Sequence, residues 1–96
     1  MKTLYIISRT PFLRGEARLP LRLADGEDGI LLIQDGVILC QAAPENLAPL
    51  VEQAKSRGVK FYACEEDIAA RGIKGSFAIV NYDGILDLFE KYQRIA

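Results

Sequence analysis

The chain has 96 residues, of which 50% are hydrophobic and 26% are charged, a composition typical of one ordered domain. Twelve basic and thirteen acidic side chains give a net charge of −1, which argues against direct binding to nucleic acid. The apolar runs are well below the roughly 18 residues needed to cross a bilayer, so we expect a cytoplasmic protein without a membrane segment.

The residue types that are missing narrow the possible chemistry. There is no histidine, which excludes Ser-His-Asp and Cys-His catalysis within the chain and any zinc site that needs imidazole. The two cysteines, Cys40 and Cys64, are too few for a four-thiolate site, and a cytoplasmic protein should keep both reduced. We therefore expect neither a metal nor a cofactor.

In chain order, the first predicted element is an apolar, β-rich strand at residues 3–7. Residues 13–24 have a helical pattern that Pro20 should kink or divide. A second strand is predicted at residues 30–34, before the turn signal Asp35-Gly36. A helix should begin near Asn46, with Pro49 in its first turn, and stop at Gly58.

The second half of the chain repeats this alternation. A strand at residues 59–63 precedes a short helix at residues 65–71, which should end at Gly72. A strand at residues 77–80 precedes a helix with Asp83 as its predicted N-cap and an apolar face made of Ile85, Leu88, Phe89 and Tyr92. The last four residues are a candidate edge strand.

Strands that alternate with helices indicate βαβ units. We therefore predict one α/β domain over residues 1–96: a small three-layer sandwich, flavodoxin-like, with a mostly parallel sheet of four to five strands and helices on both faces. Ligand sites of such sheets lie beyond the carboxyl ends of the strands, here residues 8–11, 34–36, 64–67 and 81–84. The candidate binding residues in and near these segments are Asp35, Gly36, Glu65, Arg71, Tyr82 and Asp83.

Cys64 lies where the third predicted strand gives way to a helix. Backbone amides at a helix N-terminus lower a thiol pKa, whereas Glu65, Glu66 and Asp67 raise it, so the two effects could cancel. The simpler interpretations are a buried core cysteine and acids that favour the first turn of the helix. Apolar neighbours make Cys40 a packed, inert thiol.

Four segments carry a resemblance to a known family: SRTPF, LLIQDGV, YACEEDIAARGI and VNYDGILDLFEKY. In order and spacing they resemble the DsrH/TusB family of the DsrE-like superfamily, over most of the chain. The resemblance implies the small α/β sandwich and a subunit that assembles with DsrE/TusD-like and DsrF/TusC-like chains. Such a complex passes sulfur as a cysteine persulfide to a small carrier protein, without a metal. The pathway is 2-thiolation of the tRNA wobble uridine or, alternatively, dissimilatory sulfur oxidation.

The chain departs from the family pattern at two positions. Some DsrH-type members have a cysteine in the first helix, which is absent here near Pro20, and TusB-type members usually have leucine in place of Cys64. The DsrE/TusD-type relatives place their persulfide cysteine at the end of this strand, before a short helix that ends in Arg-Gly, as in residues 64–72. The resemblance thus makes Cys64 the candidate persulfide carrier. The alternatives are that Cys64 lines the pocket of a partner's persulfide, or that the chain is a non-catalytic structural or homo-oligomeric protein.

Overall fold

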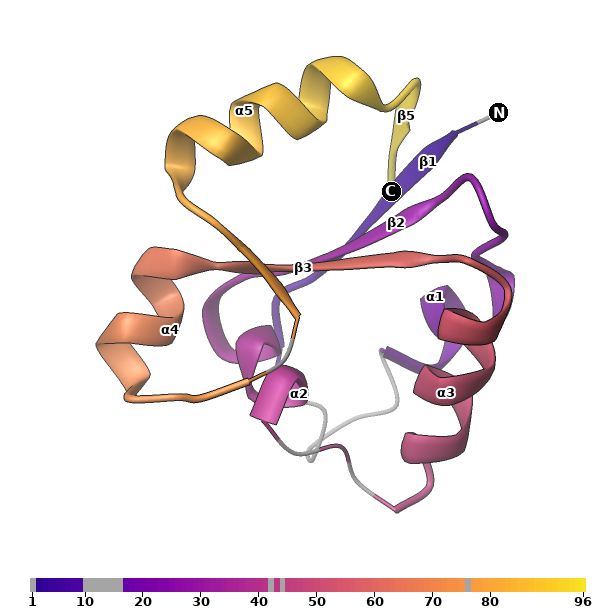
Figure 1. The fold of residues 1–96 in the computed structure, drawn as a ribbon, viewed down its shortest axis with the longest axis horizontal. Helices are drawn as coiled ribbons and strands as arrows, with labels where there is room; N and C mark the ends of the chain where they lie inside the picture. Colours follow the sequence, from indigo (N-terminus) through magenta and orange to yellow (C-terminus); the bar gives the residue numbers. More distant parts are fainter. Residues whose placement is uncertain (1, 10–16, 42, 44, 76) are drawn as a thin grey trace.

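The computed structural model describes residues 2–9, 17–41, 43, 45–75 and 77–96 (Figure 1). The elements of this part of the chain, in order, are β1 (Thr3–Ile7), α1 (Arg18–Leu23), β2 (Gly29–Leu32), a 3₁₀ helix (Gln34–Val37), α2 (Ile38–Gln41), α3 (Ala48–Ser56), β3 (Lys60–Cys64), α4 (Glu65–Arg71), β4 (Ala78–Val80), α5 (Tyr82–Lys91) and β5 (Arg94–Ile95). None of the helices described is long and apolar enough to cross a membrane.

The described strands form one sheet in the order β4-β3-β2-β1-β5, and every pair is parallel. Helix α5 lies on one side of the sheet, and α1, α2 and α3 lie on the other (Figure 1). This confirms the predicted α/β sandwich with a parallel sheet and helices on both faces. The edge strand at the C-terminus is also confirmed, as β5.

The register assigns each strand residue to a face of the sheet. Leu4 pairs with Gly29, and Gly29 packs against the Tyr92 hydroxyl just beyond α5, so this face is the one that α5 covers. Ile30 and Leu32 alternate with these residues and face the other helices. Because β2 is buried on both faces, its residues form a continuous apolar run.

Several element boundaries differ from the sequence prediction. The second strand ends at Leu32 and is followed by the 3₁₀ helix and α2, which were not predicted. Pro20 is the third residue of α1, where its missing N–H has no helical partner to lose, so it does not divide the described helix. The remainder of that prediction, residues 13–16, lies outside the described residues.

The prediction for the start of α5 was wrong by two residues. The N-cap is Asn81, whose side-chain oxygen accepts a hydrogen bond from the Gly84 N–H at 2.8 Å, whereas Asp83 is already inside the helix. Both residue types favour N-caps, so the sequence does not distinguish them. The end of α4 is as predicted, since Gly72 takes the left-handed conformation, with φ 62°.

Candidate functional site

Cys64 is the last residue of β3 and the N-cap of α4. It pairs with Val80 of β4, and it lies on the same face as Tyr62, the face that α5 covers. Its side chain has no solvent exposure. The predicted strand-to-helix junction is therefore correct, and the thiol at that junction is enclosed.

Glu66, in the first turn of α4, links this thiol to the start of α5. Its Oε1 lies 3.5 Å from the Cys64 Sγ, within hydrogen-bond reach of an S–H donor. Its Oε2 accepts a hydrogen bond from the backbone N–H of Tyr82 at 3.3 Å. One carboxylate thus holds both the cysteine and the first residue of α5.

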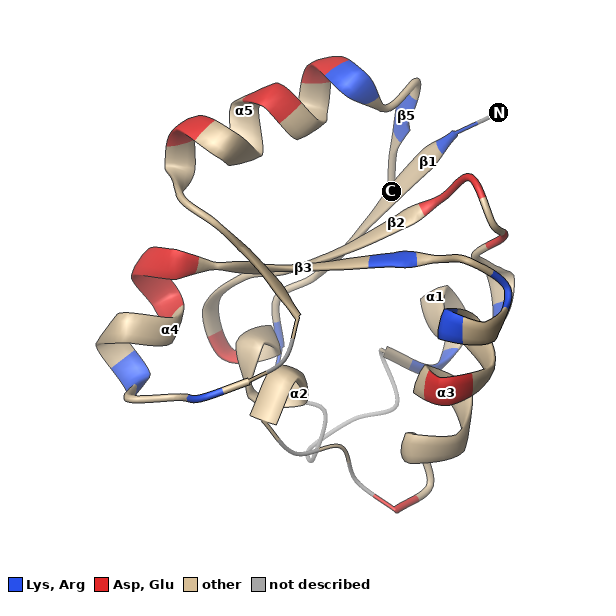
Figure 2. Cartoon of the chain, in the orientation of Figure 1, with Lys and Arg blue, Asp and Glu red and all other residues tan. Residues whose placement is uncertain are grey.

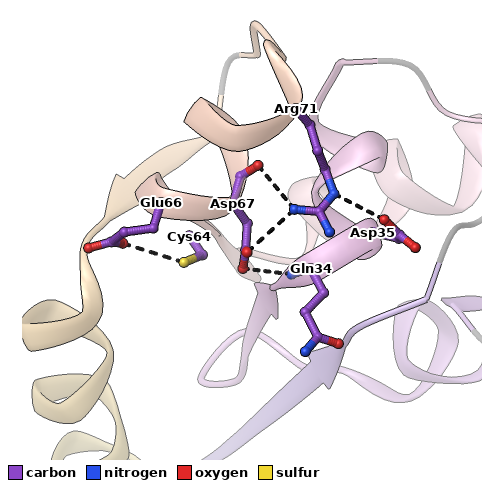
Figure 3. Close-up of polar contacts among 6 residues, drawn as sticks. All are labelled: Gln34, Asp35, Cys64, Glu66, Asp67 and Arg71. Carbon is purple, nitrogen blue, oxygen red and sulfur yellow. Dashed lines mark hydrogen bonds and ion pairs between the residues drawn. The ribbon is translucent and has the colours of Figure 1, made fainter.

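Asp67 and Arg71 tie α4 to the end of β2 (Figure 3). Asp67 Oδ2 accepts a hydrogen bond from the Gln34 N–H at 2.7 Å, and Gln34 has a φ of 50°, a conformation that costs energy outside glycine. Arg71 Nε lies 3.0 Å from Asp35 Oδ1, and another nitrogen of the same guanidinium lies 3.4 Å from Asp67 Oδ1. The arginine is therefore engaged by two carboxylates.

The surroundings of Cys64 raise its pKa. Burial is the largest cause, and the hydrogen bonding and negative charge of the Asp67 side chain raise the pKa further. The backbone N–H groups of Asp67 and Glu66 act in the opposite direction. The two effects left open by the sequence do not cancel, and the resting thiol is held in its protonated form.

This protonated thiol should react slowly with alkylating reagents. In folded protein at neutral pH, we expect iodoacetamide to modify Cys64 far more slowly than in urea, because the thiolate is the nucleophile. The labelling rate should continue to rise with pH above the pKa of a free cysteine, where the rate for a free cysteine levels off. Because the folded-state pKa is the higher one, the thiol's contribution to stability is complete below the unfolded pKa of about 8.5 and is lost as the pH rises through the folded pKa. Peptide mass mapping of the alkylated protein measures the labelling rate of Cys64, and rapid labelling at pH 7 would contradict a protonated thiol.

A pocket of about 260 Å³ opens beside this network, at the carboxyl ends of β1 and β2 and under α5. Its polar lining comes from Gln34, Asp67 and Tyr82, and its apolar lining comes from Ile6, Leu31, Ile33, Ile85 and Phe89. Loss of solvation raises the pKa of the Tyr82 hydroxyl, and the nearby Asp67, Cys64 and Glu66 raise it further. Tyr82 thus belongs both to the pocket and to the surroundings of Cys64.

The structure brings some of the predicted binding residues together and separates others. Asp35 and Arg71 pair directly, and Tyr82 contacts the network through its backbone. Gly36 is buried, and a side chain there would collide with the Ile7 carbonyl oxygen. Glu65 and Asp83 are exposed at the starts of α4 and α5.

Gln34, Glu66 and Asp67 make these contacts, and they lie in the segments 34–36 and 64–67 that were predicted to border the ligand site, although none of the three was named among the candidate binding residues. From the sequence, the two acids were interpreted as residues of a first helical turn whose charge raises the pKa of Cys64. The available signal was the parallel pairing of β2 and β3, in which Leu32 is opposite Ala63, so the residues that follow the two strands lie at the same edge of the sheet.

Cys40 lies on the opposite side of the sheet from Cys64. It lines a pocket of about 170 Å³ with Val51 and Phe77, and Phe77 packs against Phe61, which faces away from α5. Both cysteines are buried and free. Among the described residues, no group of three or more potential ligands is arranged to hold a metal ion.

Fold and site together define a small all-parallel α/β protein with an enclosed cysteine at a strand-to-helix junction. The model of the DsrH family, described as "DsrH like protein", matches residues 9–95. Relatives called Protein TusB, from Yersinia pestis (strain Pestoides F) and Yersinia pseudotuberculosis serotype IB, are each 35% identical to this chain over 95% of both chains. The solution structure of Protein Tm0979 from Thermotoga maritima has a TM-score of 0.67 and 28% identity, and the match covers 93% of this chain and 92% of that one.

The chain belongs to the DsrH family. The family match and the TusB relatives confirm the resemblance seen in the sequence, and they support the sulfur-relay role and the multi-subunit setting that it implies.

Proposed function

We propose that this chain is the TusB-like subunit of a cytoplasmic sulfur-relay complex that serves 2-thiolation of the tRNA wobble uridine. The observation that carries the proposal is the enclosed Cys64 at the carboxyl edge of the sheet, in a chain that matches the DsrH family almost from end to end. The partners are DsrE/TusD-like and DsrF/TusC-like chains, and the acceptor is a small sulfur-carrier protein.

Within that complex, Cys64 is the proposed sulfur carrier. Its thiolate attacks the terminal sulfur of a donor persulfide, a new S–S bond forms at Cys64, and the donor's S–S bond breaks. The donor leaves as a thiolate and takes up a proton, so one sulfur atom moves and no net oxidation occurs. Because the resting thiol is buried and protonated, the transfer requires that the Glu66 contacts above it open first.

The burial of Cys64 also favours a second candidate function, that of a passive subunit. In this alternative the chain completes the complex and the partner chains alone carry the sulfur. A DsrH-like role in dissimilatory sulfur oxidation uses the same chemistry and differs in the acceptor.

Restoration of thiouridine in cells tests the proposed pathway. In a bacterial strain that lacks its own TusB, we expect this chain to restore 2-thiouridine in tRNA when it is supplied together with the TusC-like and TusD-like chains of its own genome. Nucleoside mass spectrometry measures the product, and the same strain with the two partner chains alone is the control. A complex that assembles without restoring thiouridine would favour the sulfur-oxidation role, and failure of the chains to assemble would contradict both.

A further inference from the structure

Among the described residues, one face of the sheet is covered by a single helix. Helix α5 lies on this face, whereas α1, α2 and α3 lie on the other (Figure 1). Ile95 of β5 pairs with Leu4, so it belongs to the α5 face, and it is 42% exposed. On the same face, Ile6 of β1 is only half-buried. Parallel sheets are normally covered on both faces, and in the part of the chain that the structure describes no helix covers the β1–β5 edge of this face, which leaves an apolar surface there.

Helix α5 carries exposed apolar residues next to that edge, in addition to its buried face. It buries Ile85 and Leu88 against the sheet. It also carries Tyr82, Leu86 and Phe89 at positions i, i+4 and i+7, which are 59%, 60% and 40% exposed. We call these three residues the α5 stripe. The sequence prediction placed Phe89 on the buried face, and the structure corrects it, because Phe89 lies at the boundary between the buried face and solvent.

The α5 stripe and the half-buried edge of the same sheet face meet in the 260 Å³ pocket. Tyr82 and Phe89 line the pocket from α5, Ile6 lines it from β1, and Ile33 lines it from just beyond the end of β2. The stripe, the pocket and the sheet edge therefore form one apolar surface with a recess large enough for an anchoring side chain.

The charges beside this surface indicate what binds it. Asp83, Asp87 and Glu90 each follow a stripe residue by one position, so they form a row along the neighbouring side of α5 that is acidic except for Lys91 at its C-terminal end (Figure 2). In a symmetric contact between two copies, these acidic rows would lie close to each other, at an electrostatic cost. A partner with lysine or arginine next to an apolar side chain meets the surface without that cost.

We propose that the α5 stripe and its pocket form the docking surface for a different subunit, which inserts an apolar side chain into the pocket and places basic residues against the acidic row. The inference rests on the proposed function for the identity of the partners, the TusC-like and TusD-like chains. A partner docked there lies next to Tyr82, whose N–H is held by the same Glu66 that contacts Cys64. The docking surface therefore lies beside the Glu66 contact that closes access to the thiol.

Two substitutions of equally exposed leucines test the docking surface. Leu86, in the stripe, is 60% exposed, and Leu19, on α1 on the other side of the sheet, is 62% exposed. The TusC-like and TusD-like chains of the same genome are titrated with wild type, Leu86→Glu and Leu19→Glu, and assembly is followed by native mass spectrometry. We expect Leu86→Glu to weaken assembly by about tenfold or more, and Leu19→Glu to change it by less than about twofold. Because both leucines are exposed, circular dichroism should show both variants folded.

Charge reversal and self-association complete the test. Asp87→Lys should also weaken assembly, and raising the salt concentration should weaken the wild-type complex.

Equal assembly by wild type and Leu86→Glu would overturn the docking surface while leaving the relay role intact. Wild type that assembles with neither chain would instead refute the proposed function. Sedimentation that shows wild-type dimers lost in Leu86→Glu would assign the surface to a second copy and overturn the heterologous partner.

Discussion

Replacement of Gly36 by alanine is expected to destabilise the protein by about 3 kcal/mol. Gly36 lies in the 3₁₀ helix after β2, and an added Cβ would overlap the carbonyl oxygen of Ile7 in β1. Backbone lies on both sides of this contact, so neither a rotamer change nor a side-chain shift relieves it. The turn would have to move away from β1, together with Gln34 and Asp35, which contact α4.

Gly72→Ala is the matched control for this substitution. Gly72 has a left-handed backbone, with φ 62°, and no atom lies within 4 Å of the position that a Cβ would take. Replacing it with alanine should therefore lower the free energy of unfolding only by the cost of a left-handed backbone at a non-glycine residue, about 1 kcal/mol. Urea unfolding measures both variants. A loss for Gly36→Ala no larger than that for Gly72→Ala would show that the approach of the turn to β1 is not tight.

This result would also change the role given to Gly36. From the sequence, Gly36 was a candidate binding residue because it follows a strand in a parallel α/β sheet. The structure shows a buried glycine that lets two segments of backbone approach each other. A position at the correct edge of the sheet does not distinguish a ligand contact from a packing requirement, because both favour glycine.

The architecture could be predicted from the sequence because its signals are local. The apolar runs at β1 and β2, and the helical spacing of Leu47, Val51 and Ala54, each indicate one element and one buried face. Helix α2 was missed because the four residues Ile38–Gln41 are too short to show a helical period.

The contacts of the candidate site could not be predicted because they join distant segments. Asp67 contacts Gln34 across 33 positions of sequence, and Glu66 contacts Tyr82 across 16. Aspartate and glutamate, the types of Asp67 and Glu66, are equally common in the first turn of an exposed helix that has no such contacts. Likewise, the helical spacing assigns Phe89 to the buried face, and only the position of α5 at one side of the sheet leaves it at the boundary.

Sulfur loading on Cys64 is the second large effect that we expect. When the protein is incubated with a sulfane sulfur donor, wild type should gain about 32 Da, the mass of one sulfur atom, as Cys64 becomes a persulfide. Cys64→Ser should gain none, since a hydroxyl does not accept sulfane sulfur. Cys40→Ser should load as wild type does, because Cys40 lies in a different pocket on the other side of the sheet.

The Glu66 contacts give this measurement a second readout. Glu66→Gln keeps the size of the side chain and replaces the carboxylate that accepts the Cys64 S–H with a neutral amide. Loading of Cys64 should then be faster at neutral pH, while the total gain stays at one sulfur atom. A merely structural role for Glu66 would leave the loading rate unchanged in protein that is equally folded.

Intact mass after exposure to a persulfide donor, compared among wild type, Cys64→Ser and Cys40→Ser, tests most directly whether this DsrH-family chain carries sulfur. The assembled complex should be used, so that the contacts above Cys64 are those of the working state. A single added sulfur atom on wild type and on Cys40→Ser, and none on Cys64→Ser, is the predicted result. No gain on wild type, or an equal gain on Cys64→Ser, would contradict the carrier role and leave the chain as a passive subunit.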